Sequence, residues 1–312
     1  MSIIGGVDVS KQWLDVFCSG AREVKRYQYT TSGCLRLLKH LQKATVTLVV
    51  LESTGGYERR LCRLLWAAGV PVAVVNPRWV KAFAASRGWK AKNDSIDAQL
   101  LMEYGERNNP QPTPAVPEVI ERLRGFLTRR EQLNGMLVME KNHAAAPEIP
   151  LEMRREIRKS IGAIRRQIKA VDECIAKTIE STPEIQTKAQ KLREQTGVGP
   201  VLMTSLIADV PELGRVRRNV ASALVGVAPY DHDSGSLKGK RSISGGRARP
   251  RKALYMATLA AIRHNPQIKS FYQRLVARGK PRKVAIVACM RKFIVFLNAV
   301  LRENPEQHFL AA

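Results

Sequence analysis

The feature that most constrains the fold is an alternation of short apolar runs with helical patterns over the first 87 residues. Five runs have the composition of β-strands, at 3–9, 13–20, 24–31, 46–53 and 70–77. Helical spacing of apolar residues covers 32–42, 57–69 and 78–87. The order is three strands, then helix and strand in alternation. It predicts an α/β domain with a mixed sheet that helices flank.

The remainder of the chain has a helical pattern. A proline-rich stretch at 108–117 is followed by predicted helices over about 118–143 and 150–180, with apolar residues every three or four positions between Ile157 and Ile175. Two short helices joined by glycine turns are predicted at 195–214, and further helices at 251–264, 266–278 and 281–302. We therefore predict a first domain at 1–117, a helical hairpin or coiled coil at 118–190, and a mainly α domain at 191–312.

The net charge is +25 and the sequence pI is about 10.3. Residues 191–312 alone carry 22 Lys and Arg against 7 Asp and Glu. This charge predicts nucleic acid as the partner, with an anionic membrane surface as the second choice. No membrane span is predicted, because basic residues such as Arg291 and Lys292 interrupt the apolar stretches. The start lacks a signal-peptide layout and five cysteines are scattered, which together indicate a cytoplasmic protein with reduced thiols.

Four acidic residues are conspicuous in so basic a chain. Asp8 and Glu52 lie near the ends of two predicted strands, and Asp94 and Asp97 lie three residues apart in "KNDSIDAQLL". Carboxylates at the ends of parallel strands meet at one sheet edge, and a converging set repels itself unless a cation lies between. Oxygen ligands select Mg²⁺, or Mn²⁺, and two such ions about 3.5–4 Å apart activate a phosphodiester.

A simpler interpretation of these acids also stands. Asp94 can be a helix N-cap, with Asp97 beside the positive end of the helix dipole. Asp8 can be a turn residue and Glu52 a solvent-facing strand end. The occurrence of all four acids in one basic domain favours the metal site.

The C-terminal part has a basic, glycine-rich loop, "YDHDSGSLKGKRSISGGRARPRK", at 230–252. A serine here could act as a nucleophile if a base removes its proton and cations neutralise a phosphate. The alternative is a flexible loop that contacts phosphates, with its serines as turn formers. The upstream "TGVGP" at 196–200 fits either a phosphate-binding helix-hairpin-helix turn or an ordinary helix–helix turn.

Long motifs, in order along nearly the whole chain, resemble the DEDD-type insertion-sequence transposases. They are "GVDVSK", "LESTGGYERRL", "VNPRWVKAFAASRGWKAKNDSIDAQLL" and "TGVGP" followed by "LVGVAPYDHDSGSLKGKRSISGGRARPRKALYMATLA". The resemblance implies an RNase H-like (RuvC-like) first domain with Asp8, Glu52, Asp94 and Asp97 as Mg²⁺ ligands. It also implies a C-terminal transposase domain with a serine that joins covalently to DNA. The matching serine is Ser234, with Ser236, Ser242 and Ser244 nearby.

The resemblance further implies the partners: donor and target double-stranded DNA, a non-coding bridge RNA that pairs with both, and a homo-oligomer that is a dimer of dimers. Basic residues near the acids and in the serine loop are predicted to bind nucleic acid: Lys11, Arg87, Lys90, Lys92, Lys238, Lys240, Arg241, Arg247, Arg249 and Arg251.

Three other functions fit parts of the sequence. A junction resolvase of the same fold would cleave with metal-activated water, and Ser234→Ala would leave its cleavage intact. A non-catalytic nucleic-acid-binding protein would bind without strand transfer. A sugar-kinase-like ATPase would share "GVDVSK", but it needs adenosine-binding glycine motifs that the second half lacks between suitable strands.

Overall fold

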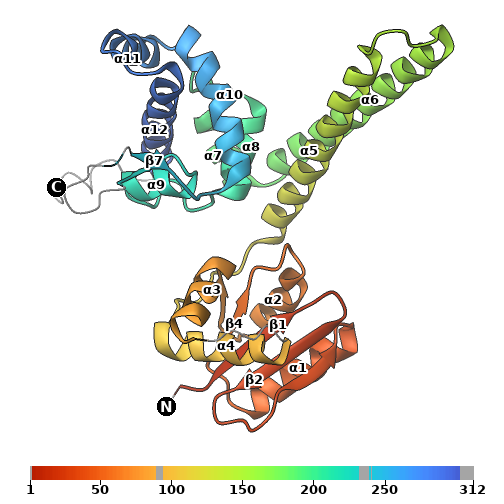
Figure 1. The fold of residues 1–312 in the computed structure, drawn as a ribbon, viewed down its shortest axis with the longest axis vertical. Helices are drawn as coiled ribbons and strands as arrows, with labels where there is room; N and C mark the ends of the chain where they lie inside the picture. Colours follow the sequence, from red (N-terminus) through yellow and green to blue (C-terminus); the bar gives the residue numbers. More distant parts are fainter. Residues whose placement is uncertain (1, 89–93, 232–238, 240, 303–312) are drawn as a thin grey trace. The chain divides into compact units, whose positions relative to one another are not determined.

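The chain forms two compact units, Met1–Val116 and Pro117–Ala312, and each is described here by itself. The computed structural model describes residues 2–88, 94–231, 239 and 241–302, and of residues 94–96 it describes only the backbone. Figure 1 shows the elements of both units. Among the described residues, no helix has the length and apolarity that a bilayer crossing needs.

Unit 1 is built on a five-stranded sheet. Its strands are β1 (Ile4–Val9), β2 (Trp13–Cys18), β3 (Lys25–Gln28), β4 (Leu48–Glu52) and β5 (Val72–Val75), arranged in the order β3-β2-β1-β4-β5. The β1–β2 and β2–β3 pairs are antiparallel, whereas β1–β4 and β4–β5 are parallel. The predicted mixed sheet is confirmed.

Helices cover both faces of this sheet (Figure 1). On one face, α1 (Thr31–Lys43) and α2 (Glu58–Ala67) pack their leucines against alternate strand residues such as Val7 and Val49. On the other, α3 (Pro77–Ser86) and α4 (Asp94–Asn108) pack against the intervening residues, such as Ile4 and Val50. The two faces therefore follow the period-two alternation of the strands.

Several elements of unit 1 are shorter than predicted, and β3 is an example. The strand predicted at 24–31 ends at Gln28, because the Thr30 side chain accepts a hydrogen bond from the Gly33 amide and begins α1. The proline-rich stretch lies in part along the sheet edge. The Thr113 amide donates to the Val72 carbonyl at 2.7 Å, and the Val74 amide donates to the Thr113 hydroxyl at 2.9 Å. This pairing satisfies polar groups of the edge strand β5.

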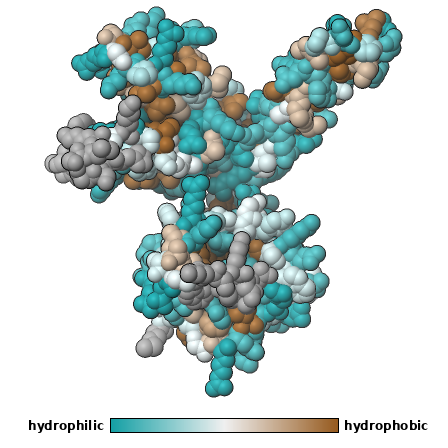
Figure 2. All heavy atoms as spheres, viewed as in Figure 1, coloured by the Kyte–Doolittle hydropathy of each residue, from teal (hydrophilic) through white to brown (hydrophobic). Residues whose placement is uncertain are grey.

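Unit 2 begins with an antiparallel hairpin of α5 (Glu118–Ala144) and α6 (Leu151–Glu180), close to the bounds predicted for both helices. A two-pronged ion pair between Arg130 and Asp172, at 2.6 and 3.3 Å, joins them. Exposed apolar side chains gather near the loop that connects the helices, including Met139 and Met153, and Figure 2 shows this end of the hairpin partly in brown.

The remaining elements are α7 (Pro183–Arg193), α8 (Pro200–Asp209), α9 (Arg218–Leu224), β6 (Pro229–Tyr230), β7 (Ser242–Ile243), α10 (Ala248–His264), α11 (Pro266–Ala277) and α12 (Arg282–Val300). Phe293 of α12 is fully buried in their core. The expectation of two short helices in 195–214 was wrong, because only α8 lies there. The separation of a hairpin domain from a C-terminal domain stays a prediction.

Candidate functional site

Asp8 on β1 and Glu52 on β4 lie side by side in unit 1. The parallel register pairs Gly6 with Val50, and two further residues along each strand bring Asp8 level with Glu52. Both share the face of Ile4, Leu48 and Val50, since side chains alternate along a strand. Both carboxylates are half-buried, and each makes an interaction within the chain. The structure thus brings these two predicted site residues together, on the face that α4 covers.

Helix α4 runs over β1 in the opposite direction. A Cβ atom on Gly105 would lie 2.6 Å from Ile4, whereas a Cβ atom on Gly6 would lie 2.1 Å from the Ala98 carbonyl oxygen. At about 1.5 Å per helical residue and 3.3 Å per strand residue, the step from Gly6 to Asp8 corresponds to about four earlier helical residues. The first turn of α4, which contains the half-buried Asp97, therefore lies near Asp8.

The structure describes the side chains of only three of the four predicted acids, Asp8, Glu52 and Asp97. Asp94 is the first residue of α4, but its side chain lies outside the described atoms. Within the described residues, no group of three His, Cys, Asp or Glu side chains is arranged to hold a metal ion. What the described part provides is a pair of adjacent carboxylates and the helix end that carries the other two acids.

Gly6, like Gly105, lets α4 approach the acid-bearing strand β1. A methyl group there would meet the Ala98 carbonyl oxygen at 2.1 Å and the Met102 amide nitrogen at 2.4 Å, and both are backbone atoms of α4.

Gly6→Ala should therefore lift α4 from β1. We expect a loss of about 3 kcal/mol in the free energy of unfolding, measured by urea denaturation. Gly135→Ala on the exposed face of α5, where a new Cβ atom meets nothing within 4 Å, is the control. It should stabilise the protein by about 0.5–1 kcal/mol. Equal stability of Gly6→Ala and the unchanged protein would contradict this packing.

Two further charged residues, Asp15 and Arg26, lie across neighbouring strands from Asp8, and the sequence analysis did not predict them. Asp15 on β2 pairs in register with Asp8, and Arg26 on β3 pairs with Asp15. Asp15 is only 3 % exposed, and the Arg26 guanidinium donates to both its oxygens at 2.7 and 2.9 Å. Arg26 therefore neutralises the buried negative charge of Asp15, which lies next to Asp8. The period-two alternation along "WLDVFC" could have indicated that Asp15 faces the same side.

The loop after Glu52 is fixed by Glu58 at the start of α2. One oxygen of this buried carboxylate accepts hydrogen bonds from the Thr54 amide at 3.1 Å and the Gly56 amide at 2.8 Å. Gly55 and Gly56 have φ of 70° and 107°, which favour glycine. The motif "STGGYE" therefore builds the turn that follows the second acid.

Of the predicted nucleic-acid-binding residues in unit 1, Lys11 is exposed in the turn after β1, and Arg87 caps α3 and lies 3.6 Å from the Glu103 carboxylate. Lys90 and Lys92 lie outside the described residues.

The serine loop of unit 2 is described at its base only. Ser234, Ser236, Lys238 and Lys240 lie outside the described residues. The base is a short antiparallel ladder in which Pro229 pairs with Ile243 and Tyr230 with Ser242. An ion pair between Asp231 and Arg241 follows directly, with both side chains largely exposed. Ser242 and Ser244 are exposed on the returning strand and just after it.

Next to this ladder, the backbone at Gly226 touches the backbone at Gly245 and Gly246. A Cβ atom on Gly246 would lie 2.1 Å from the Gly226 amide nitrogen, and one on Gly226 would lie 2.3 Å from the Gly245 carbonyl oxygen. All three glycines have positive φ. The Arg247 amide adds a 2.8 Å hydrogen bond to the Leu224 carbonyl. The segments that enter and leave the serine loop are therefore in direct contact.

Three arginines that were predicted to bind nucleic acid bond within the protein. Arg247 donates to both Glu212 oxygens at 2.7 and 2.6 Å, and Arg249 reaches Asp209 at 3.2 Å. Arg251 donates to the Gly245 carbonyl at 2.6 Å. Burial raises the pKa of Glu212, but the Arg247 hydrogen bonds and charge outweigh it, so the pKa lies below its usual range. These three arginines therefore stabilise the segments at the base of the serine loop.

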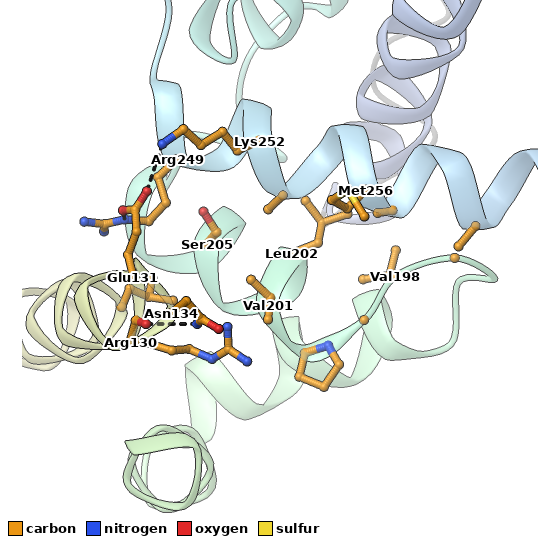
Figure 3. Close-up of a pocket in the computed structure, with 17 residues that line it drawn as sticks. Arg130, Glu131, Asn134, Val198, Val201, Leu202, Ser205, Arg249, Lys252 and Met256 are labelled. Atoms are coloured by element: carbon orange, nitrogen blue, oxygen red, sulfur yellow. Dashed lines mark hydrogen bonds and ion pairs between the residues drawn. The ribbon is translucent and has the colours of Figure 1, made fainter. Parts of the chain in front are cut away.

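The "TGVGP" turn joins α7 to α8 and lines a pocket of about 770 Å³ between α5, α8 and α10 (Figure 3). Its apolar wall includes Val198, Val201 and Met256, and Glu131 lies at its rim, bonded to Lys252. A Cβ atom on Gly197 would lie 2.9 Å from Ala261, so this glycine allows close packing on α10. In this structure the turn contributes to an apolar wall.

Comparison with known proteins gives two family matches. Residues 5–146 match a family model of the DEDD type described as "Transposase", and residues 189–273 match one described as "Transposase IS116/IS110/IS902 family". The pilin gene-inverting proteins of Moraxella bovis and Moraxella lacunata are 28 % and 29 % identical to this chain, and each match covers 96 % of this chain and 95 % of the relative. An uncharacterized 42 kDa protein of insertion element IS900 from Mycobacterium paratuberculosis is 26 % identical over 47 % of this chain and 39 % of its own length.

Proposed function

Because the chain belongs to the IS110 family of transposases and is thus a DNA recombinase, we propose that it cleaves and exchanges strands between donor and target DNA through a serine–DNA intermediate. The observation that carries this proposal is the parallel register that sets Asp8 beside Glu52 under the first turn of α4. A pair of adjacent carboxylates that can hold a divalent cation suits phosphodiester chemistry.

We propose an RNase H-like (RuvC-like) fold for unit 1. The strand order β3-β2-β1-β4-β5, with an antiparallel half and a parallel half, supports it. So does the position of the acids on the central β1 and its parallel neighbour β4, near their carboxyl ends. Active sites of open α/β sheets gather at such ends.

The residues present fit a hard divalent cation. Asp8, Glu52, Asp94 and Asp97 offer only carboxylate oxygens, which suits Mg²⁺, or Mn²⁺, and not zinc. When bound, such ions neutralise charge on the scissile phosphate. The half-burial of Asp8 and Glu52 concentrates two like charges on one face, which favours cation binding over two isolated carboxylates.

Ser234 is the proposed nucleophile in unit 2. Its hydroxyl oxygen loses its proton and bonds to phosphorus as the bond from phosphorus to the departing deoxyribose oxygen breaks, and that oxygen gains the proton in exchange. A free hydroxyl end of the partner strand then attacks the same phosphorus and releases the serine. Arg241, which pairs with Asp231 at the loop base, is a candidate to bind the phosphate, because phosphate can replace the exposed carboxylate as the partner of its guanidinium.

The remaining assignments come from the family. We propose that a bridge RNA selects both DNA sites, that the working form is a dimer of dimers, and that the protein acts in the cytoplasm on nucleoid DNA. The two Moraxella relatives are named for inverting a pilin gene, which requires exchange between two sites on one DNA. Exchange between two sites is the reaction proposed here.

The test is recombination from a plasmid that carries this gene with its native flanking DNA and a library of target sites. We expect new donor–target junctions by sequencing, and co-purified RNA encoded beside the gene. In vitro, EDTA should abolish joining while filter binding of DNA persists, and added Mg²⁺ should restore it. Joining at full rate in EDTA would contradict a metal-dependent site.

A further inference from the structure

Helix α6 presents four exposed arginines on the side away from its partner helix. Its apolar residues, among them Ile164 and Ile175, are buried where α6 packs on α5. At about 100° per residue, four arginines fall within an arc of about 100° on the opposite side: Arg155, Arg158, Arg165 and Arg166. The arrangement is a straight basic stripe, called here the α6 stripe.

Positive charge predominates along the stripe. Lys159 and Lys169 extend it, and each pairs with an acid of the same helix, Lys159 with Glu156 at 2.7 Å and Lys169 with Glu173 at 4.0 Å. Between residues 155 and 169 the sequence has one acid, Glu156. Gly162 lies near the middle of the arc, so no side chain interrupts the surface there. A ligand that follows this stripe therefore meets more positive than negative charge.

The four stripe arginines differ from other arginines of the chain. Arg26, Arg130 and Arg247 each form two-pronged pairs with carboxylates that fix the fold. The stripe arginines make no ion pair or hydrogen bond with any residue that the structure describes. Their planar guanidinium groups, which suit phosphate oxygens, are thus available to an external anion.

We propose that the α6 stripe binds the sugar–phosphate backbone of duplex DNA. Residues 155–169 span about 21 Å of helix, and duplex DNA carries one phosphate per about 3.4 Å on each strand, so about six phosphates fit the six basic side chains. The helix has no Phe, Tyr or Trp on which unpaired bases could stack, which favours a duplex over a single strand. DNA is the substrate class of this family.

The test uses the full chain, freed of nucleic acid by high salt, and a 40-base-pair duplex DNA of arbitrary sequence. The triple variant Arg155→Gln, Arg158→Gln and Arg165→Gln is compared with Arg36→Gln, Lys39→Gln and Lys43→Gln on the exposed side of α1, which removes the same charge. Affinity is measured by fluorescence anisotropy between 50 and 300 mM salt, and folding by circular dichroism.

We expect the α6 variant to bind about a hundredfold more weakly at 100 mM salt, with a slope of log affinity against log salt that is smaller by about 2–3. The α1 variant should lose much less. Equal losses in the two variants would overturn the proposal, and so would a loss on duplex RNA of the same sequence with DNA binding unchanged. The readout is binding alone, so it succeeds or fails independently of Asp8 and Ser234.

Discussion

Asp8→Ala and Glu52→Ala are each expected to reduce strand exchange to below about a thousandth of the unchanged rate, equivalent to about 4 kcal/mol of transition-state stabilisation. The two carboxylates lie side by side on β1 and β4, so removing either would leave the proposed cation site incomplete. DNA binding should persist, because the proposed phosphate contacts are made by basic residues and not by the acids. Junction formation and filter binding are measured on the same preparations.

The matched control is Glu23→Ala, which removes an exposed acid of the same unit. It should leave the exchange rate unchanged. Asp97→Ala, at the first turn of α4, should be as severe as Asp8→Ala. An Asp8→Ala protein that still exchanges strands, with its fold intact by circular dichroism, would refute the metal site.

Ser234→Ala is expected to prevent any covalent adduct between protein and DNA. A serine oxygen bonded to phosphorus survives denaturation, so the adduct is detected as DNA that stays with the protein in detergent gels. The exchange rate should fall at least about a thousandfold, since a methyl group cannot form the intermediate. Mass spectrometry of the digested adduct should place the nucleotide on the peptide that contains Ser234.

Ser242→Ala and Ser244→Ala are the controls, because both serines lie near the loop base and are exposed. Each should retain the adduct. An adduct that maps to Ser242 or Ser244 moves the nucleophile within the loop and leaves the mechanism standing. Cleavage that persists in Ser234→Ala with no adduct at all indicates a nuclease that uses water.

Much of unit 1 could be predicted from the sequence. Strands β1 and β4 were predicted because each is a short apolar run, and the order of elements required a mixed sheet. Helices α5 and α6 were found from their three- and four-residue apolar spacing. The ends of elements were less predictable, as at β3, where the Thr30 cap decides between strand and helix.

The partners of charged residues could not be predicted. The sequence shows that Arg247 and Arg249 are cations but not that Glu212 and Asp209 lie against them. Asp15 was overlooked for the same reason, since its role depends on strand pairing with Asp8 and Arg26. Net charge therefore overstates the number of cations available to nucleic acid. The arginines of the α6 stripe can be distinguished from the others only when the structure shows which arginines pair with carboxylates.

The contact of Gly226 with Gly246 holds together the two ends of the stretch between them. Because the two ends touch, the positions of α9 and α10 should depend little on how many residues lie between Asp231 and Arg241. Doubling the length of a flexible loop costs only about 0.6 kcal/mol. Changes of length between Asp231 and Arg241 should therefore cost the fold little when both glycines are kept, whereas strand exchange is expected to require Ser234 as well.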